Sequence, residues 1–165
     1  MDFEKTSMKE YLQSHDSLTY RFAGVSMRPM LRQESDLVTI VPYDGKGLQK
    51  YDVALYEKES SNKYILHRVV DVTEKDGKKF YTFLGDNCPE KESDIPDETI
   101  IAVLKEFYRG DKKCSVTDKG YRIYCRVHYF FYPLRRVYYL IRKKIAKIPL
   151  ARNIYHKLFK RGKKN

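Results

Sequence analysis

The chain of 165 residues has no tryptophan and only three cysteines, and its last part has no acidic residue. Cys88, Cys114 and Cys125 form no CxxC pair and no spacing typical of metal ligands, so we interpret them as free thiols in a reducing compartment. The four histidines are too dispersed to suggest a metal site, and no glycine-rich phosphate loop is present. The sequence therefore predicts no metal and no other cofactor.

Long apolar runs are also missing. Cations recur every few residues in the C-terminal part, so no stretch approaches the roughly 18 consecutive apolar residues of a membrane-spanning helix. An amphipathic helix is expected around residues 5–12, but it lacks the apolar core of a secretory signal. If made as written, the chain is expected in the cytoplasm, where it could also lie peripherally at the inner membrane face.

Charge is distributed very unevenly along the chain. Residues 1–120 carry 19 Lys+Arg and all 22 Asp+Glu, whereas residues 121–165 carry 14 basic residues and no acid, within a total charge of +11. This break predicts a boundary near Gly120. We expect an N-terminal helical segment at 1–17, a β-rich domain at 18–120, and a basic, aromatic helical tail at 121–165.

The β-rich part consists of short runs of strand-forming residues separated by turn signals such as Asp44-Gly45 and Asp76-Gly77. This pattern predicts a mainly β (α+β) chain with a twisted, mostly antiparallel sheet. Residues 109–120 are polar and are expected to close a hairpin or to link to the tail. The expected strands cover residues 20–25, 37–41, 52–56, 64–72, 79–84 and 100–108.

The tail combines aliphatic and aromatic residues with cations at helical spacing. One or two basic amphipathic helices are expected, interrupted near Pro133 and Pro149. Three interpretations are open: contact with a membrane surface, a solvated helix packed on the β domain, and nucleic-acid binding, which is least favoured because no reading motif is present. The apolar positions are Val137, Leu140, Ile141, Ile145 and Ile148; the cations between them are Arg142, Lys143, Lys144 and Lys147.

Three short segments carry candidate chemistry: GVSMRPML at 24–31, LHRVV at 66–70 and LGDN at 84–87. A serine hydroxyl is a poor nucleophile unless a neighbouring base takes its proton and a third group orients that base. Ser26, His67 and an aspartate from residues 86–97 are the candidates for these roles.

These motifs resemble the signal peptidase I and self-cleaving repressor superfamily of serine peptidases. The resemblance covers roughly residues 20–106: a GxSMxPxL box, a YDVALY-like strand, a basic pair ahead of valines, and GDN. Bacterial and repressor branches have lysine before the arginine of that pair, whereas the endoplasmic-reticulum and archaeal-like branch has histidine. Since His67 precedes Arg68, the chain resembles the Ser-His type, which implies a twisted antiparallel signal-peptidase-like catalytic domain.

The resemblance assigns roles to individual positions. It implies that Ser26 is the nucleophile and His67 the general base, and that Met27 and Pro29 of the SMxP box belong to the substrate-binding region. Gly24 has no Cβ and would let a substrate strand approach closely. The substrate is then expected to lie extended beside a strand edge.

The third member of the site has two candidates. Asp94 best fits the later acid of the family and is preferred as the partner of His67, while Asp86 of GDN could instead support the site. The chain departs from the family in having Met30 where threonine is usual and an extra residue before Asp36, and in its longer spacing from GDN to the next aspartate. Loop insertions would account for the length differences.

The favoured function is a serine endopeptidase that cleaves a leader-like, signal-like or dedicated peptide substrate through an acyl-enzyme on Ser26. Each residue also has a purely structural interpretation: Ser26 as a turn residue, His67 as a half-buried strand residue, and Gly85-Asp86-Asn87 as a type I′ turn. The alternative is a non-catalytic basic β domain that binds a membrane surface, a peptide or nucleic acid.

Overall fold

The computed structural model describes residues 8–58 and 63–145. The chain divides into two compact units, Met1–Tyr129 and Phe130–Asn165. Helix α2 (Lys119–Phe130) therefore belongs almost entirely to the first unit. The charge break predicted a boundary near Gly120, at the start of this helix, whereas the structural division lies at its end.

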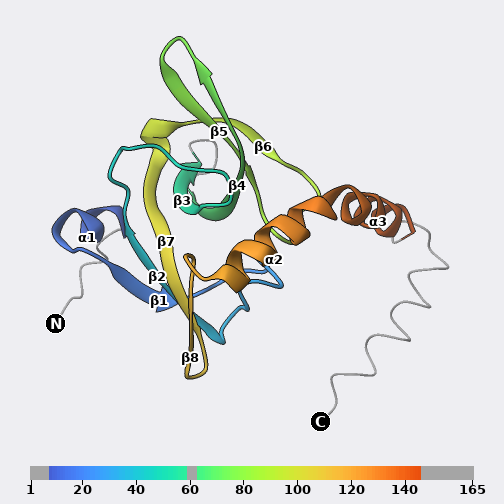
Figure 1. Cartoon of the computed structure of the whole chain (residues 1–165), viewed down its shortest axis with the longest axis horizontal. Helices are drawn as coiled ribbons and strands as arrows, with labels where there is room; N and C mark the ends of the chain where they lie inside the picture. Colours follow the sequence, from blue (N-terminus) through green and yellow to red (C-terminus); the bar gives the residue numbers. More distant parts are fainter. Residues whose placement is uncertain (1–7, 59–62, 146–165) are drawn as a thin grey trace. The chain divides into compact units, whose positions relative to one another are not determined.

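The first unit is built on a single sheet of eight described strands, all paired antiparallel (Figure 1). The strand order is β1-β2-β7-β3-β4-β5-β6, and β8 pairs with β7. The expected mainly β, antiparallel fold is confirmed; β6 and β8 were not among the expected strands. The strands are β1 Leu18–Arg21, β2 Asp36–Pro42, β3 Val53–Lys58, β4 Lys63–Lys75, β5 Lys78–Leu84, β6 Glu92–Pro96, β7 Ile100–Arg109 and β8 Lys112–Ser115.

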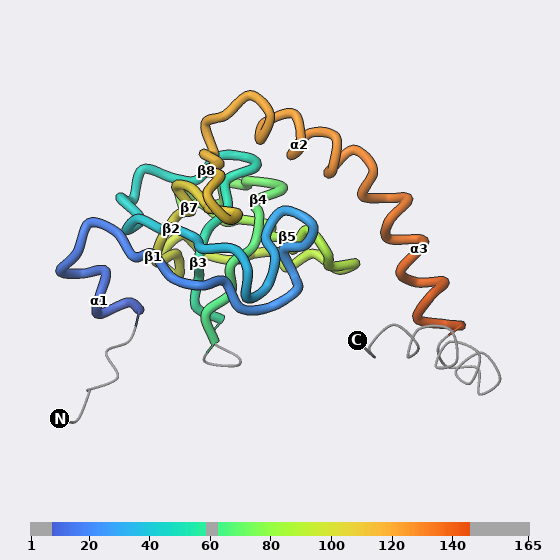
Figure 2. The backbone as a smooth tube through the Cα atoms, turned by 90° about the horizontal axis from the view of Figure 1, so that it is seen from below, coloured from blue at the N-terminus to red at the C-terminus, as the bar shows by residue number. Residues whose placement is uncertain are grey.

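Tight turns connect neighbouring strands where glycine permits a positive φ. The two-residue turn Asp76-Gly77, between the paired Lys75 and Lys78, has φ of 53° and 72°, the pattern of a type I′ turn. Gly110, with φ of 58°, lies in the turn between β7 and β8, so residues 109–120 do close a hairpin. The chain then passes from β8 directly into α2 (Figure 2).

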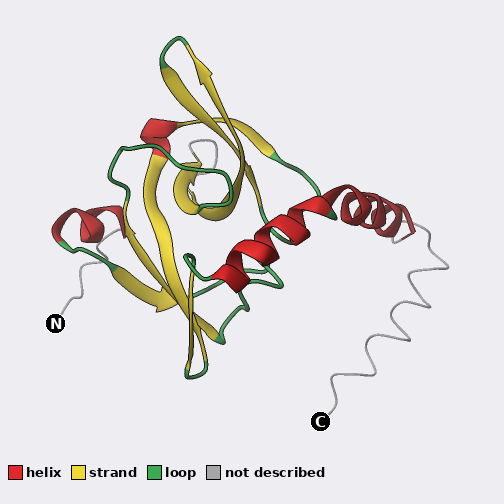
Figure 3. Cartoon of the chain, viewed as in Figure 1, coloured by secondary structure: helices red, strands yellow, loops and turns green. Residues whose placement is uncertain are grey.

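Helices occupy the two ends of the described chain (Figure 3). Helix α1 is Met8–Ser14, so the start of the helix expected around residues 5–12 lies outside the described residues. Helix α3 (Tyr132–Ile145) begins beside Pro133, which is tolerated in a first turn because its missing N–H has no partner there. The expected break at Pro149 lies outside the described residues, as do Lys147 and Ile148. A short 3₁₀ helix, η1, covers Asp97–Thr99.

The sheet is strongly curled, and its strand pairing shifts register at four places. Such irregularities increase the local twist of antiparallel strands. Apolar side chains form two buried clusters. The first cluster includes Met27, Met30 and Leu31, which come from the loop between β1 and β2. That loop, which contains Ser26, is therefore anchored in the core.

Candidate active site

Ser26 lies in the loop between β1 and β2, and its side chain is half-buried. Two turn hydrogen bonds shape the loop: Arg28 N–H donates to the Val25 carbonyl at 3.2 Å, and Leu31 N–H donates to the Met27 carbonyl at 2.9 Å. Gly24 has a φ of 110°, a backbone conformation that residues with a Cβ rarely adopt. The space beside its Cα is open. The sequence thus forms a loop in which Met27, Met30 and Leu31 are buried while Ser26 stays near the surface.

His67 lies on β4, opposite Ala54 of β3, and is only 7% exposed. Its imidazole contacts the Tyr56 ring edge-on, with ring centroids 6.4 Å apart. Since successive side chains on a strand point to opposite faces, the next residue, Arg68, points away from it. His67 is therefore buried in the sheet, on the face of β4 opposite to Arg68.

Gly85 of the GDN segment marks the point where Ser26 and His67 approach each other. A Cβ added to Gly85 would lie 2.8 Å from the Ser26 carbonyl oxygen and 2.9 Å from His67 Nε2. Asn87 then ties the two loops together, because its N–H donates to the Ser26 carbonyl at 2.7 Å and its side-chain amide donates to the Val25 carbonyl at 3.2 Å. Glycine is required here for space, and the GDN loop fixes the serine loop beside the histidine.

The Ser26 hydroxyl does not donate to His67 in this structure. Among the described residues, neither the hydroxyl nor the backbone N–H of Ser26 forms a hydrogen bond. The backbone N–H of Ser26 is thus available to a ligand. Catalytic hydrogen bonds are often long or absent without substrate, so the missing bond does not exclude a catalytic pair.

Ser26 and His67 line the same groove, of about 640 Å³. Its walls are mainly apolar and come from the end of β1 and the start of β4. Among the described strands, residues 18–21 pair only with β2 and residues 63–67 pair only with β3. Each segment therefore has one edge with unpaired backbone groups, on the side away from its partner strand. Unpaired edges can accept an added strand. Apart from Ser26 and His67, the lining residues that matter here are Tyr20, Phe22, Leu55 and Leu66.

The other expected substrate-binding residues do not line this groove. Met27 is completely buried in the core, where it anchors the loop. Pro29 is exposed and lines a separate shallow depression with Arg28 and Arg32. Gly24 contributes its backbone conformation to the loop.

The carboxylate nearest to His67 belongs to Glu92, at the start of β6. Glu92 Oε1 lies 3.5 Å from His67 Nδ1, an ion-pair distance that exceeds an ordinary hydrogen bond. His67 Nδ1 is buried and has no hydrogen-bond partner among the described residues. The other oxygen of Glu92 accepts from Lys58 Nζ at 2.5 Å. Glu92 is therefore oriented by a cation on one side and faces the imidazole on the other.

Asp94, the preferred partner of His67, lies elsewhere. Its carboxylate is largely exposed and pairs with Lys75 Nζ at 2.6 Å. The β5–β6 register explains this, because Phe83 pairs with Glu92 whereas Tyr81 pairs with Ile95, which leaves an extra residue on β6. Asp94 has a φ of 58° within this bulge. The bulge turns Asp94 outward and leaves Glu92 beside the base.

Asp86, the second candidate, is buried beside Arg68. Arg68 Nε and Nη2 donate to the two carboxylate oxygens of Asp86 at 2.9 and 2.8 Å, a bidentate pair. Asp86 and Asn87 have no positive φ, so GDN does not form the type I′ turn that was the structural alternative. The charge of Asp86 acts on His67, where it raises the pKa of the imidazole.

Helix α2 completes the environment of this buried pair. Tyr121 OH and Cys125 Sγ each accept from Arg68 Nη1 at 2.9 Å, and Tyr124 OH donates to Asp86 Oδ2 at 2.9 Å. The Tyr51 carbonyl also lies 3.1 Å from Nη1 and shares its two hydrogens with these acceptors, while Nη2 donates to the Met30 sulfur at 2.8 Å. Every guanidinium nitrogen thus donates a hydrogen bond. Helix α2, which the sequence placed in the tail, supports the loop that carries GDN.

Burial is the main influence on the acid–base chemistry of the site. It lowers the pKa of His67 below its ordinary value of 6.5; the charges of Glu92 and Asp86 oppose this effect and Lys58 reinforces it. Burial raises the pKa of the nearby Cys88 thiol, and Glu92 raises it further. At neutral pH the imidazole is therefore a neutral proton acceptor, while Cys88 remains a protonated, weakly nucleophilic thiol.

Comparisons with known proteins add no family to this description. No protein-family model matches the chain, and no curated protein matches it in sequence. Within residues 8–58 and 63–145, no group of three or more His, Cys, Asp or Glu side chains is placed to hold a metal ion.

Proposed function

We propose that this protein is a serine endopeptidase of signal-peptidase-like type, with Ser26 as nucleophile and His67 as general base. One observation carries the proposal: the missing Cβ of Gly85 lets the Ser26 backbone carbonyl and His67 Nε2 approach the same point, and both residues line one groove between two unpaired strand edges. The motif resemblance to signal peptidases of the Ser-His type points to the same two residues.

The proposed chemistry begins with proton transfer. Neutral His67 Nε2 takes the proton of the Ser26 hydroxyl as Oγ attacks the substrate carbonyl carbon. The resulting tetrahedral oxyanion needs donors, and the unused backbone N–H of Ser26 can supply one. His67 then gives its proton to the leaving amine, the C–N bond breaks, and a Ser26 ester remains. Water repeats the sequence, with His67 as base, and releases the acid product.

Glu92 takes the orienting role in this proposal. A carboxylate facing Nδ1 favours the tautomer with its proton on Nδ1, which leaves the Nε2 lone pair free to accept the Ser26 proton. The same charge stabilises the imidazolium that forms during the attack. Lys58 limits this effect, because it shares the carboxylate.

The substrate that best fits the groove is an extended peptide. Such a peptide could add as a strand to the free edge of β1 or of residues 63–67, which would present its carbonyl groups in line with Ser26. The groove walls favour apolar side chains at neighbouring peptide positions. A leader-like, signal-like or dedicated peptide is consistent with this binding mode.

The test is labelling of the purified full-length protein with a fluorophosphonate probe. We expect labelling of the wild type, none of Ser26→Ala, and very little of His67→Ala, with unchanged circular dichroism. Ser14→Ala, an exposed serine at the end of α1, is the matched control and should label normally. Cys88→Ala is a second control because this thiol lines the same groove.

The outcomes separate three cases. Labelling that is lost in Ser26→Ala but retained in Ser14→Ala supports the proposal. Loss in Cys88→Ala with labelling retained in Ser26→Ala would reassign the nucleophile to the thiol. A folded wild type that does not label and cleaves no peptide library would favour the second candidate, a non-catalytic peptide-binding domain, which the absent Ser26–His67 hydrogen bond supports.

A further inference from the structure

Exposed apolar side chains are concentrated in α2, α3 and the junction between them. Of the fourteen large apolar residues that are exposed in the described part of the chain, ten lie between Ile123 and Ile145. The sheet, although longer, contributes few. Ordinary surfaces expose such residues singly, and clusters of them mark interaction sites.

Helix α3 is amphipathic by itself. Its apolar residues recur at intervals of three and four, which places them on one side of a helix, and each is 49% to 67% exposed. By the same spacing two of the five cations fall on the opposite side and three at the borders of the apolar side, and the helix has no acidic residue. The apolar side consists of Leu134, Val137, Tyr138, Ile141 and Ile145; the basic residues are Arg135, Arg136, Arg142, Lys143 and Lys144.

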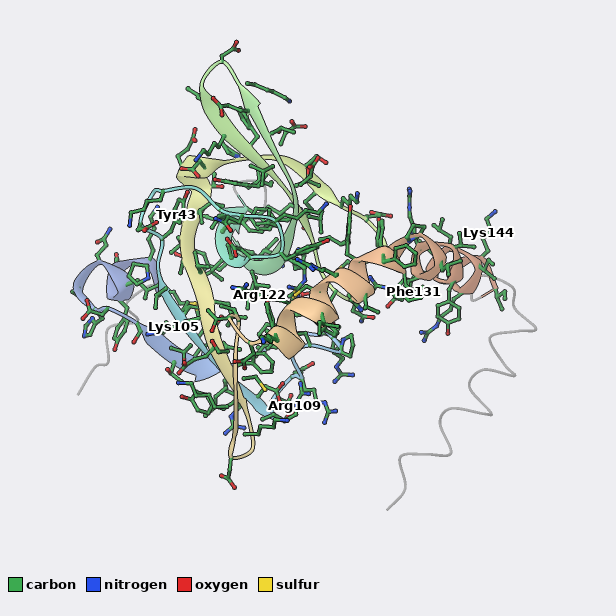
Figure 4. All side chains as sticks on the ribbon, viewed as in Figure 1. Tyr43, Lys105, Arg109, Arg122, Phe131 and Lys144 are labelled. Carbon is green, nitrogen blue, oxygen red and sulfur yellow. The ribbon has the colours of Figure 1, made fainter. Side chains whose placement is uncertain are left out.

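Helix α2 has the same property on the side that does not support the Arg68–Asp86 pair. Ile123, Val127 and Phe130 follow one another at helical spacing and are 50% to 76% exposed. Arg122 and Arg126 flank them, again without an acid. Figure 4 labels Arg122 on α2, with Phe131 and Lys144 near the two ends of α3. Both helices thus carry an apolar stripe bordered by cations.

These stripes fit one kind of partner better than others. A lipid surface takes up apolar side chains in its acyl region and attracts cations through anionic headgroups. Nucleic acid would satisfy the cations but leave the apolar stripes in water, and a second copy of a chain of charge +11 would be repelled. No helix in the described ranges is long and apolar enough to cross a membrane.

We propose that the exposed apolar stripe of α3 binds the surface of an anionic lipid bilayer, with the helix lying in the interface, and that the stripe of α2 in the first unit is a second surface of the same kind. The 14 basic and no acidic residues of 121–165 supply the charge complementarity. The inference does not depend on the chemistry at Ser26, so either proposal can fail without the other.

The experiment is sedimentation of the full-length protein with vesicles of phosphatidylcholine alone and of phosphatidylcholine mixed with phosphatidylglycerol. We expect binding to the anionic vesicles, little binding to the neutral ones, and weakening by salt. Leu134→Glu/Ile141→Glu should reduce the affinity at least about tenfold. Val72→Glu, at an exposed apolar residue of β4, is the matched control and should bind normally.

Two further variants make the test sharper. Arg135→Gln/Arg142→Gln should weaken binding more than Lys78→Gln/Lys112→Gln, which removes the same charge from exposed strand positions. Because the chain has no tryptophan, Tyr138→Trp provides a single reporter whose emission should shift to the blue with anionic vesicles. Tyr64→Trp, on β4, should show no such shift.

Several results would overturn the proposal. These are no binding to anionic vesicles, equal binding to both vesicle types at all salt concentrations, and full binding by Leu134→Glu/Ile141→Glu. Tighter binding to single-stranded DNA, unaffected by the same double substitution, would indicate a nucleic-acid surface. A dimer that protects Tyr138→Trp from quenching without vesicles would assign the stripes to a second copy.

Discussion

His67 and Arg68 are consecutive, buried residues of β4, yet they differ in how far their side-chain nitrogens are hydrogen-bonded. Every guanidinium nitrogen of Arg68 donates a hydrogen bond. Among the described residues, His67 Nδ1 has no hydrogen-bond partner and faces the Glu92 carboxylate at 3.5 Å, and the Ser26 hydroxyl forms no hydrogen bond. The face of β4 that carries Arg68 is fully hydrogen-bonded and is called the saturated side below. The face that carries His67 has, within the described part of the chain, a polar atom without a hydrogen bond and is called the open side.

This difference indicates which side is structural and which is available for chemistry. A buried charge is costly unless it is paired, so removing one partner on the Arg68 side should destabilise the fold. A catalytic pair instead needs a free nucleophile and a neutral base. The two sides meet at Gly85-Asp86, where Asp86 belongs to the saturated network and Gly85 separates Ser26 from His67.

The largest effect is expected from breaking the saturated side. Arg68→Met leaves the Asp86 carboxylate buried without its cation and should lower the free energy of unfolding by about 3–5 kcal/mol. Adding Asp86→Asn to this variant should lower the free energy of unfolding by less than the sum of the two single substitutions, because the double variant has no buried, unpaired carboxylate. Urea unfolding measures both. Arg122→Met, an exposed arginine of α2, is the control and should change stability by less than about 0.5 kcal/mol.

Gly85→Ala would affect the open side while leaving the paired charges intact. Its Cβ would lie 2.6 Å from Cys88 Sγ, 2.8 Å from the Ser26 carbonyl oxygen and 2.9 Å from His67 Nε2, so these groups must move apart. A displacement of about 1 Å at a reacting pair costs on the order of 100-fold in rate, which labelling kinetics would measure. Gly120→Ala, with no atom near its added Cβ, should label at the wild-type rate. Equal rates in both variants would contradict the proposed convergence.

Glu92→Gln should reduce the labelling rate by about 10- to 100-fold, because the imidazolium loses its facing charge while the side chain keeps its shape. The loss is moderated by the 3.5 Å separation and by the ion pair of Glu92 with Lys58. Asp94→Asn, two residues away and paired with exposed Lys75, should leave the rate unchanged. The reverse result would restore Asp94 as the partner of His67.

The smallest effect concerns pH. Burial lowers the pKa of His67 below 6.5, so the labelling rate should rise with pH and reach half its maximum below pH 6.5. Lys58→Met removes a charge that lowers this pKa, and should move the midpoint upward by a small amount. A profile centred well above 6.5 would assign the titration to another group.

The same shift has a consequence for stability. The unfolded chain binds a proton at His67 at a higher pH than the folded chain does. The contribution of neutral His67 is therefore present above pH 6.5 and is lost as the pH falls through the lowered pKa of the folded state. Urea midpoints measured across this range for wild type and His67→Gln would show it.

Local features were predictable because they depend on neighbouring residues. Alternating apolar runs and glycine turns indicated six of the eight strands in the described part of the chain, and 3.6-residue spacing indicated the tail helices. Two strands were missed: β6, which contains the bulge at Asp94, and polar β8. Glu92 was missed because only aspartates were considered as the third group, although either carboxylate can face an imidazole.

By itself, the sequence determined the antiparallel β class, the loop motif around Ser26, the His67-Arg68 pair and the amphipathic character of the tail, since each follows from local spacing and side-chain chemistry. Only the tertiary structure decided which carboxylate faces His67 and which one is buried with Arg68. The curl of the sheet, the register shift in β6 and the packing of α2 bring together residues that are distant in the chain. No periodicity in the sequence encodes those long-range distances.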